Sequence, residues 1–279
     1  MNMTDINKKP TVEEMLLAEP NNLPKRIAIF VVLLILMIWG SSSISAGNAG
    51  AQGAVVAQGI LHGITHPNKA LLFSLGADGV PYLVLQTIAI AVLGTIFGAI
   101  LAIPVSFLAS SNIVPKWVAF IFRALILLIR TIPSLVWALV WIRVTGPGAF
   151  CGVVTQSICS IGMISKMYIT AIEDLDTGIL ESLDAAGCNT FQKIRCGILP
   201  QLSASFISTA IYRFDINLKD ATTLGIVGAG GIGSPLVQSI SYNRWSNVGA
   251  FLIALIILVI IIEWFSTKVR TRLARGKQA

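Results

Sequence analysis

Long, uninterrupted apolar stretches dominate this sequence, and they decide in which solvent most of the chain folds. The first begins near Ile27 and the last ends near Phe265. A run of about 18 or more apolar residues is long enough to cross the hydrocarbon layer of a bilayer as a helix. Charged residues make up 12% of the chain, against about a quarter in soluble domains. The sequence therefore predicts an all-α, polytopic membrane helix bundle.

About six membrane-spanning helices are expected. The predicted spans are 26–45, 82–109, 117–144, 150–172, 201–228 and 248–265. The first span is too long for the apolar part of a signal peptide, so we expect it to remain as an anchor. The second span carries Gly94 and Gly98 on one helix face, where small residues let two helices approach closely. The third is interrupted by Arg130-Thr131-Ile132-Pro133.

Basic residues indicate which ends of the spans face the cytoplasm. The pair Lys25–Arg26 precedes the first span, and a basic tail, residues 268–279, follows the last. Cytoplasmic flanks are enriched in Lys and Arg, so both termini are predicted to be cytoplasmic. Six spans then place the polar stretch 173–200 in the cytoplasm and residues 46–80 and 228–244 outside. The net charge of +7 is explained as a topology signal, and no nucleic-acid partner is expected.

These expectations divide the chain into five parts. They are a cytoplasmic arm 1–25, a transmembrane anchor 26–45, an outer loop 46–80 with a short surface helix, a helical core 81–267, and the basic tail 268–279. Within the arm, a short helix is predicted over Glu13–Ala18.

Four features are excluded by the sequence: a metal site, a disulfide framework, a dinucleotide site and an ATP-binding loop. No two of the four cysteines form a CxxC pair and both histidines lie far from them, so no metal site or disulfide framework is expected. The stretch Gly228–Gly233 matches GxGxxG, but it follows an apolar helix and no acid lies between Asp220 and Glu263, so it is no dinucleotide site. No GxxxxGK[ST] motif occurs, so this chain has no visible means of binding ATP.

The polar stretch 173–200 contains a specific spacing. Glu181 is followed by Gly187 and then by Leu199-Pro200, a pattern that resembles the EAA loop of ABC importer permeases, E-A-A-x3-G-x9-I-x-L-P. Ser182 and Leu183 replace the two alanines, and Gly197 replaces the isoleucine. The resemblance implies a coupling loop that receives a cytoplasmic ATPase. Its predicted residues are Glu181, Asp184, Ala185, Ala186, Gly187, Leu199 and Pro200.

The loop is predicted to form two short helices along the membrane surface. Gly187 allows a tight break, and Pro200 can open the next helix because it needs no N–H in the first turn. Four residues are spaced to share one face of a short amphipathic helix: Leu183, Ala186, Thr190 and Ile194.

Three further passages narrow the family. Arg130-Thr-Ile-Pro133, Tyr212-Arg-Phe-Asp215 and Gly225–Gly233 together resemble the phosphonate-importer permeases. The methionine-importer permeases share the first and third passages but not Tyr-Arg-Phe. The resemblance covers about residues 80–270 and implies a type I ABC importer permease fold. The implied translocation pathway or gate residues are Arg130, Pro133, Arg213, Asp215, Gly228, Gly230 and Gly231.

Two of these residues place charge deep in predicted spans. Arg213 lies 13 residues beyond Pro200, about 20 Å into the membrane at ~1.5 Å per residue, and Arg130 lies at similar depth. Ionisable groups at this depth face a partner or a water-filled cavity. Two interpretations stay open: a positive lining that tolerates a phosphonate dianion, or ion pairs, for example with Asp215.

The resemblance implies an importer permease that works by alternating access and takes up phosphonates. The implied partners are a second copy in a homodimer, two ATPase subunits that carry ATP and Mg, a periplasmic or lipid-anchored binding protein, and the lipids of the bacterial inner membrane. No catalytic site, metal or cofactor is expected in this chain itself. The alternatives are another cargo (phosphite, phosphate ester or methionine), an ion-gradient-driven secondary transporter, and a membrane assembly factor.

Overall fold

The structure is a computed structural model that describes residues 23–42 and 49–275. The helix predicted over Glu13–Ala18 lies outside these residues. The described parts consist of helices and the turns that join them, and no strand occurs in them. The chain divides into two units, Met1–Val55 and Val56–Ala279, which are described separately. The all-α prediction is confirmed.

The first unit contains α2 (Leu23–Ser42), the predicted N-terminal span. Its mean hydropathy is 2.0, and its apolar side chains are exposed. Helix α3 (Ala49–Thr65) crosses from the first unit into the second.

The second unit is a bundle of long helices with short helices at both ends. The long helices are α5 (Val80–Ala109), α6 (Lys116–Thr131), α7 (Ser134–Thr145), α8 (Ala149–Glu173), α11 (Leu199–Gly225) and α13 (Trp245–Arg275). The short elements are α4 (Lys69–Phe73), α9 (Thr177–Ala185), α10 (Thr190–Gln192), a π-helix (Lys193–Ile198) and α12 (Gly233–Ser241).

The predicted spans correspond closely to these helices. In the described part of the chain, α2, α5, α8 and α13 are each long and apolar enough to cross a membrane. Helices α6 and α7 pass the same test as one broken span, bent by 88°. Helix α11 has the length of a span but carries four ionisable side chains, Arg213, Asp215, Lys219 and Asp220.

The bend between α6 and α7 lies where the sequence predicted an interruption. Ile132 has an extended backbone (φ −88°, ψ 120°), because a residue before proline is disfavoured in the α conformation. Pro133 has no N–H to donate to the carbonyl of Ile129, and the Trp137 indole N–H donates to that oxygen instead, at 3.3 Å. A side chain therefore satisfies the backbone group that the break leaves free.

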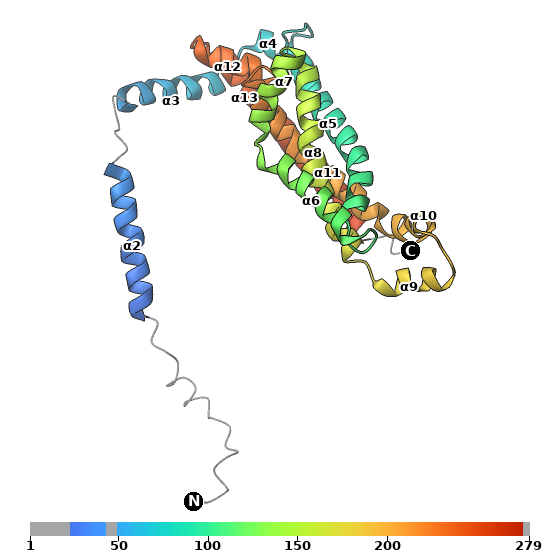
Figure 1. Ribbon diagram of the computed structural model, residues 1–279. Coiled ribbons are helices and arrows are strands. Elements are labelled where there is room, and N and C mark those ends of the chain that lie inside the picture. The colour runs from blue at the N-terminus through green and yellow to red at the C-terminus, as the bar shows by residue number, and fades with distance from the viewer. Residues whose placement is uncertain (1–22, 43–48, 276–279) are drawn as a thin grey trace, which may run out of the picture. The chain divides into compact units, whose positions relative to one another are not determined.

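The two ends of the bundle carry different elements. In Figure 1, α4 and α12 lie at one end, and α9 and α10 lie at the other. Helix α13 begins at the α12 end and finishes at the α9 end. The predicted coupling loop and the residues leading into the basic tail therefore lie at the same end of the second unit, as their predicted sidedness requires.

The core depends on a close approach between α5 and α8. A Cβ added at Gly94 would lie 2.4 Å from the Gln156 Cβ, and one added at Gly98 would lie 2.3 Å from the Ser160 Cβ. The predicted small-residue face of α5 thus contacts α8 with almost no space between the backbones. Towards the α9 end, buried side chains from α5, α8 and α11 close the interior, among them Ile164, Tyr168 and Phe206.

The segment 46–80 was predicted as a loop with one short helix, and it instead contains two helices, α3 and α4. Gly59 and Gly63 of α3 lie against Trp245 at the start of α13. The Asn68 side chain donates to the Asn247 side chain at 2.9 Å. This packing stabilises a glycine-rich helix whose local propensity is weak.

Candidate functional site

The predicted coupling loop begins with a well-capped helix. The Asp176 side chain accepts a hydrogen bond from the Gly178 N–H at 2.9 Å and so caps the N-terminus of α9. Gly187 ends this helical segment with φ +74°, a left-handed conformation that favours glycine. The predicted break at this position is confirmed.

The second half of the loop leads without a gap into α11. Asn189 and Gln192 form a reciprocal capping box at the start of α10. The π-helix follows, and Pro200 lies in the first turn of α11 as predicted. The prediction of one shared helix face over Leu183, Ala186, Thr190 and Ile194 is wrong, because the chain turns at Gly187 and divides these residues between separate helices.

Most predicted coupling residues are available to a partner. Glu181, Asp184, Ala185, Ala186, Gly187 and Pro200 are exposed, and Leu199 is half-buried. Asp184 forms an ion pair with Lys193 across the loop. The Phe191 side chain, which the sequence did not single out, is 69% exposed and adds an apolar contact to this surface. The loop therefore presents a compact, mixed polar and apolar projection at one end of the bundle.

A buried polar cluster joins α5, α8 and α11. The Asn217 side-chain amide donates to Thr95 Oγ1 and to Ser160 Oγ, each at 2.8 Å. Arg213, one turn earlier, donates through Nε to Ser160 Oγ at 3.2 Å. The Gln156 side-chain amide donates to the backbone carbonyl of Asn217 at 3.0 Å. Because apolar helix surfaces supply no polar partners, the donors of this cluster bond to groups on the neighbouring helices. The side-chain oxygens of Gln156 and Asn217 are buried and accept no hydrogen bond within the described residues.

The charge pairing within α11 differs from the sequence-based hypothesis. Asp215 was suggested as the partner of an arginine, but it binds Lys219, whose Nζ lies 3.1 Å from Asp215 Oδ2. Arg213 instead faces Asp220, with 3.8 Å between Nη2 and Oδ2. The i to i+4 spacing places Asp215 and Lys219 on one helix face, whereas the fold turns Arg213 towards α8.

Arg130 and Arg213 occupy different surroundings. Arg213 is 7% exposed, whereas Arg130 is exposed and its aliphatic stem lies close to Gly162. The structure therefore does not bring these two arginines into one site. Thr95, Gln156, Ser160 and Asn217 were missed by the sequence argument. The signal for the last three was a spacing of four between polar residues in apolar spans, at 156 and 160 and at 213 and 217, whereas Thr95 had no such signal.

The glycine-rich segment forms a tight turn at the opposite end of the bundle. Gly228, Gly230 and Gly231 all have positive φ, at +89°, +82° and +73°. The Gly228 carbonyl accepts a hydrogen bond from the Gly148 N–H at 2.9 Å. A Cβ on Gly230 would lie 2.8 Å from the Ala149 Cα. The turn is therefore packed against the start of α8 with no room for a side chain at Gly230.

Side chains from α5 hold the other side of this turn. The Gly231 N–H donates to Gln86 Oε1 and the Ile232 N–H donates to Thr87 Oγ1, each at 3.0 Å. Residues 226–233 thus bridge the ends of α5, α8 and α11.

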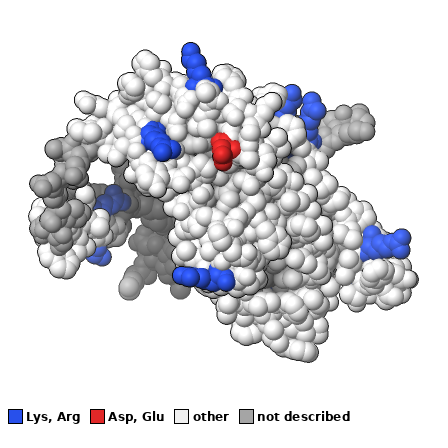
Figure 2. All heavy atoms as spheres, turned by 90° about the horizontal axis from the view of Figure 1, so that it is seen from above, with Lys and Arg blue, Asp and Glu red and all other residues white. Residues whose placement is uncertain are grey.

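The space-filling view of this end shows scattered charges on a largely uncharged surface (Figure 2). Lys69, Asp78, Arg143 and Arg244 belong to the segments near it. In the described part of the chain, no group of three or more His, Cys, Asp or Glu residues could hold a metal ion.

Residues 94–275 match the model of the family described as "Binding-protein-dependent transport system inner membrane component". The match includes the coupling loop, the polar cluster and the glycine turn. The chain belongs to this family. These permeases are membrane components of ABC importers, which also contain ATPase and substrate-binding subunits.

Two curated permeases illustrate the relationship. The phosphate-import permease protein PhnE of Mycolicibacterium smegmatis is 36% identical over 192 residues, 67% of this chain and 36% of that permease's length. The phosphite transport system permease protein PtxC of Stutzerimonas stutzeri is 32% identical over 187 residues, 67% of this chain and 68% of its own length. The matched region is therefore about a third of the mycobacterial permease.

The fold has a close counterpart among solved permeases. The MetNI methionine ABC transporter, in an inward-facing conformation, matches with a TM-score of 0.61 and 24% identity, covering 70% of this chain and 95% of that one. The type I ABC importer permease fold is therefore confirmed.

Proposed function

We propose that this permease forms the translocation pathway of an ATP-driven importer for phosphonates and works by alternating access. The single observation that carries the proposal is the family match over residues 94–275, which includes a capped, exposed loop with the spacing of an ATPase-binding segment. Two copies would form the pathway as a homodimer. The chain would supply no catalytic site, and ATP and Mg would be bound by the partner ATPases.

The proposed cargo rests on chemistry that the sequence passages and the relatives have in common. The three sequence passages resemble phosphonate permeases, and the two relatives are named for phosphate and phosphite. All three cargoes are compact phosphorus oxyanions. Phosphite is the second candidate, because the relative named for it is matched over two thirds of its length.

The polar cluster provides a means of exchanging charge partners during transport. Arg213 is buried and lies 3.8 Å from Asp220, longer than a close charge-assisted hydrogen bond. A second conformation that draws Asp220 away would leave the guanidinium free for an anion. Under this proposal Arg213 serves both interpretations left open by the sequence, pairing in one state and lining the pathway in another.

The glycine turn would act as the outer gate, opposite the coupling loop. Its backbone donates hydrogen bonds to two α5 side chains, Gln86 and Thr87, and accepts one from the Gly148 N–H before α8. A rotation of either helix would break these bonds together with the close approaches. Residues 46–80 would lie in the periplasm, α2 would be an extra anchor outside the permease core 81–267, and both termini would be cytoplasmic in a bacterial inner membrane.

Deletion of residues 181–200 tests the proposal. The expected result is loss of co-purification with the ATPase subunits, while the protein stays inserted in the membrane. Reconstituted wild-type complex should show ATP hydrolysis stimulated by methylphosphonate in the presence of the binding protein. Stronger stimulation by phosphite would select the second candidate. Uptake that continues without any ATPase, driven by an ion gradient, would refute the importer assignment.

A further inference from the structure

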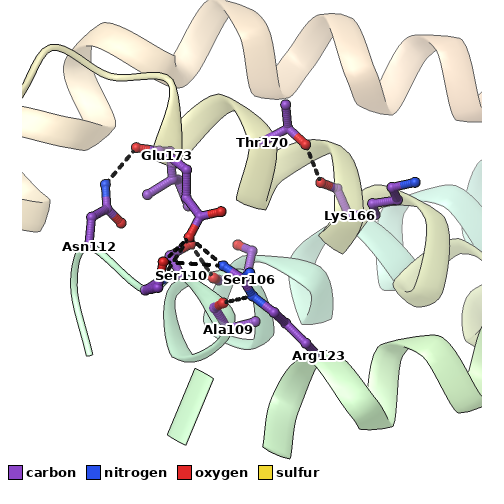
Figure 3. A network of polar contacts seen from close by, with 10 residues as sticks. Ser106, Ala109, Ser110, Asn112, Arg123, Lys166, Thr170 and Glu173 are labelled. Atoms are coloured by element: carbon purple, nitrogen blue, oxygen red, sulfur yellow. Dashed lines mark hydrogen bonds and ion pairs between the residues drawn. The ribbon is translucent and has the colours of Figure 1, made fainter. Parts of the chain in front are cut away.

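One arginine binds the residue that precedes the coupling loop and links it to two other helices. Arg123 of α6 forms an ion pair with Glu173, the last residue of α8 (Figure 3). The same guanidinium donates through Nε to the carbonyl of Ala109, the last residue of α5, at 2.8 Å. One side chain therefore ties the ends of α5 and α8 to α6.

The turn between α5 and α6 binds the same carboxylate. Glu173 Oε1 accepts hydrogen bonds from the Ser111 N–H at 2.8 Å and from the Ser111 hydroxyl at 2.6 Å. The Asn112 side chain donates to the carbonyl of Ile172 at 2.9 Å. Figure 3 shows these groups converging on the end of α8. Together they define an Arg123–Glu173 clamp with Ser111 and Asn112 as its supports.

The clamp lies directly before the segment that meets the ATPase. Three residues, 174–176, separate Glu173 from the first residue of α9. The α5–α6 turn also faces the second half of the coupling loop across a cavity of about 70 Å³ lined by Asn112, Ile113, Lys193 and Ile198. The turn between α5 and α6 therefore borders the coupling loop at two places, at the end of α8 and around this cavity.

Stability alone does not account for this arrangement. The Arg123 and Glu173 side chains are 42% and 28% exposed, and ion pairs this accessible contribute little to folding. Several donors on one carboxylate oxygen instead fix the orientation of the Glu173 side chain relative to α6 and the α5–α6 turn. Charge-assisted hydrogen bonds do this because they are short and geometrically demanding. The family's sequence spacing does not include either residue.

We propose that Arg123 and Glu173 are positioning residues that transmit motion of the coupling loop to α5 and α6. This inference rests on the proposed importer function. When the ATPases move α9, the clamp makes the ends of α5, α6 and α8 move with it. Without the clamp, the loop moves but the bundle follows incompletely, so ATP is hydrolysed with less transport.

A double-mutant cycle in the reconstituted full complex tests the clamp. The variants are Arg123→Ala, Glu173→Ala and the double substitution, and the readout is methylphosphonate taken up per ATP hydrolysed. Each single variant is expected to assemble with the ATPases and to lower this ratio by about fivefold. Because the residues act through each other, the loss in the double variant should be smaller than the product of the two single losses. Asp174→Asn is the control, since Asp174 forms no ion pair within the described residues.

The outcomes separate the two proposals. Unchanged uptake per ATP in the single variants, or single losses that multiply in the double variant, overturns the clamp while the importer function stands. Variants that no longer assemble are replaced by Glu173→Gln, which keeps an acceptor for Ser111 and removes the charge. An unchanged ratio in that variant also overturns the clamp. A wild-type chain that binds no ATPase overturns the importer function and the clamp with it.

Discussion

Leu183 fills the space that a side chain at Gly197 would need. A Cβ built on Gly197 would lie 2.5 Å from Leu183 Cδ1. In the resembling family, the position of Leu183 holds alanine and that of Gly197 holds isoleucine. Two of the three departures from the family pattern, Leu183 and Gly197, are therefore one exchange of volume across the coupling loop, from the π-helix to α9.

Gly197→Ile is expected to destabilise the loop, and Leu183→Ala in the same chain is expected to restore it. Overpacking costs about 1–3 kcal/mol, which the smaller residue relieves. Thermal stability of the purified protein and co-purification with the ATPase measure both effects. Gly178→Ala is the control, because a Cβ there meets its nearest neighbour at an ordinary 3.4 Å. Additive effects of the two substitutions would contradict the exchange.

Gly230→Ala is expected to be more harmful than Gly228→Ala. The two glycines lie in the same turn with similar positive φ, +82° and +89°, so both variants carry a backbone strain of about 1–2 kcal/mol. Only Gly230 also places its Cβ against backbone, 2.8 Å from the Ala149 Cα, whereas a Cβ on Gly228 meets its nearest neighbour, the Pro147 Cβ, at 3.6 Å. Melting temperatures and uptake rates of the two variants measure the difference. Equal losses would mean that the turn is not sealed against α8.

Gly98→Ala should weaken the α5–α8 contact. The added methyl group would lie 2.3 Å from the Ser160 Cβ and 3.0 Å from the Ser157 carbonyl oxygen, so the two backbones must separate. The expected loss of stability is about 1–3 kcal/mol. Thermal unfolding in detergent measures it. Gly40→Ala is the control, because a Cβ added at Gly40 would meet no other side chain or segment within 4 Å. Unchanged melting of the Gly98 variant would disprove the tight crossing.

Arg213→Ala is expected to impair uptake more than membrane insertion. The change removes the partner of Asp220 and one donor to Ser160, while Asn217 still joins α5 to α8. A loss of about tenfold in uptake corresponds to ~1.4 kcal/mol in the limiting step. Transport assays normalised to the amount of protein in the membrane test this. Lys219→Ala is the matched control, since it breaks the neighbouring Asp215 pair on a half-exposed face. Wild-type uptake by a well-expressed Arg213 variant would refute a role in transport.

Local rules predicted the elements that depend on neighbouring residues. Apolar runs located the spans because a helix in lipid must satisfy its own backbone. Pro133 and Gly187 marked breaks that the structure contains, because their backbone preferences act within one or two residues. The coupling loop could be recognised because the spacing of Glu181, Gly187, Leu199 and Pro200 resembles a family motif.

Contacts between segments far apart in the sequence could not be predicted from those local rules. The sequence alone determined that the chain crosses a membrane, where its helices break, and which loop resembles an ATPase contact. The tertiary structure decided that Arg213 faces Asp220, that Asn217 joins α5 to α8, that α3 folds against α13, and that Leu183 occupies the space beside Gly197. Each of these depends on the rotation and depth of one helix relative to another. Periodicity gives the face of a helix, but only packing fixes which residue that face meets.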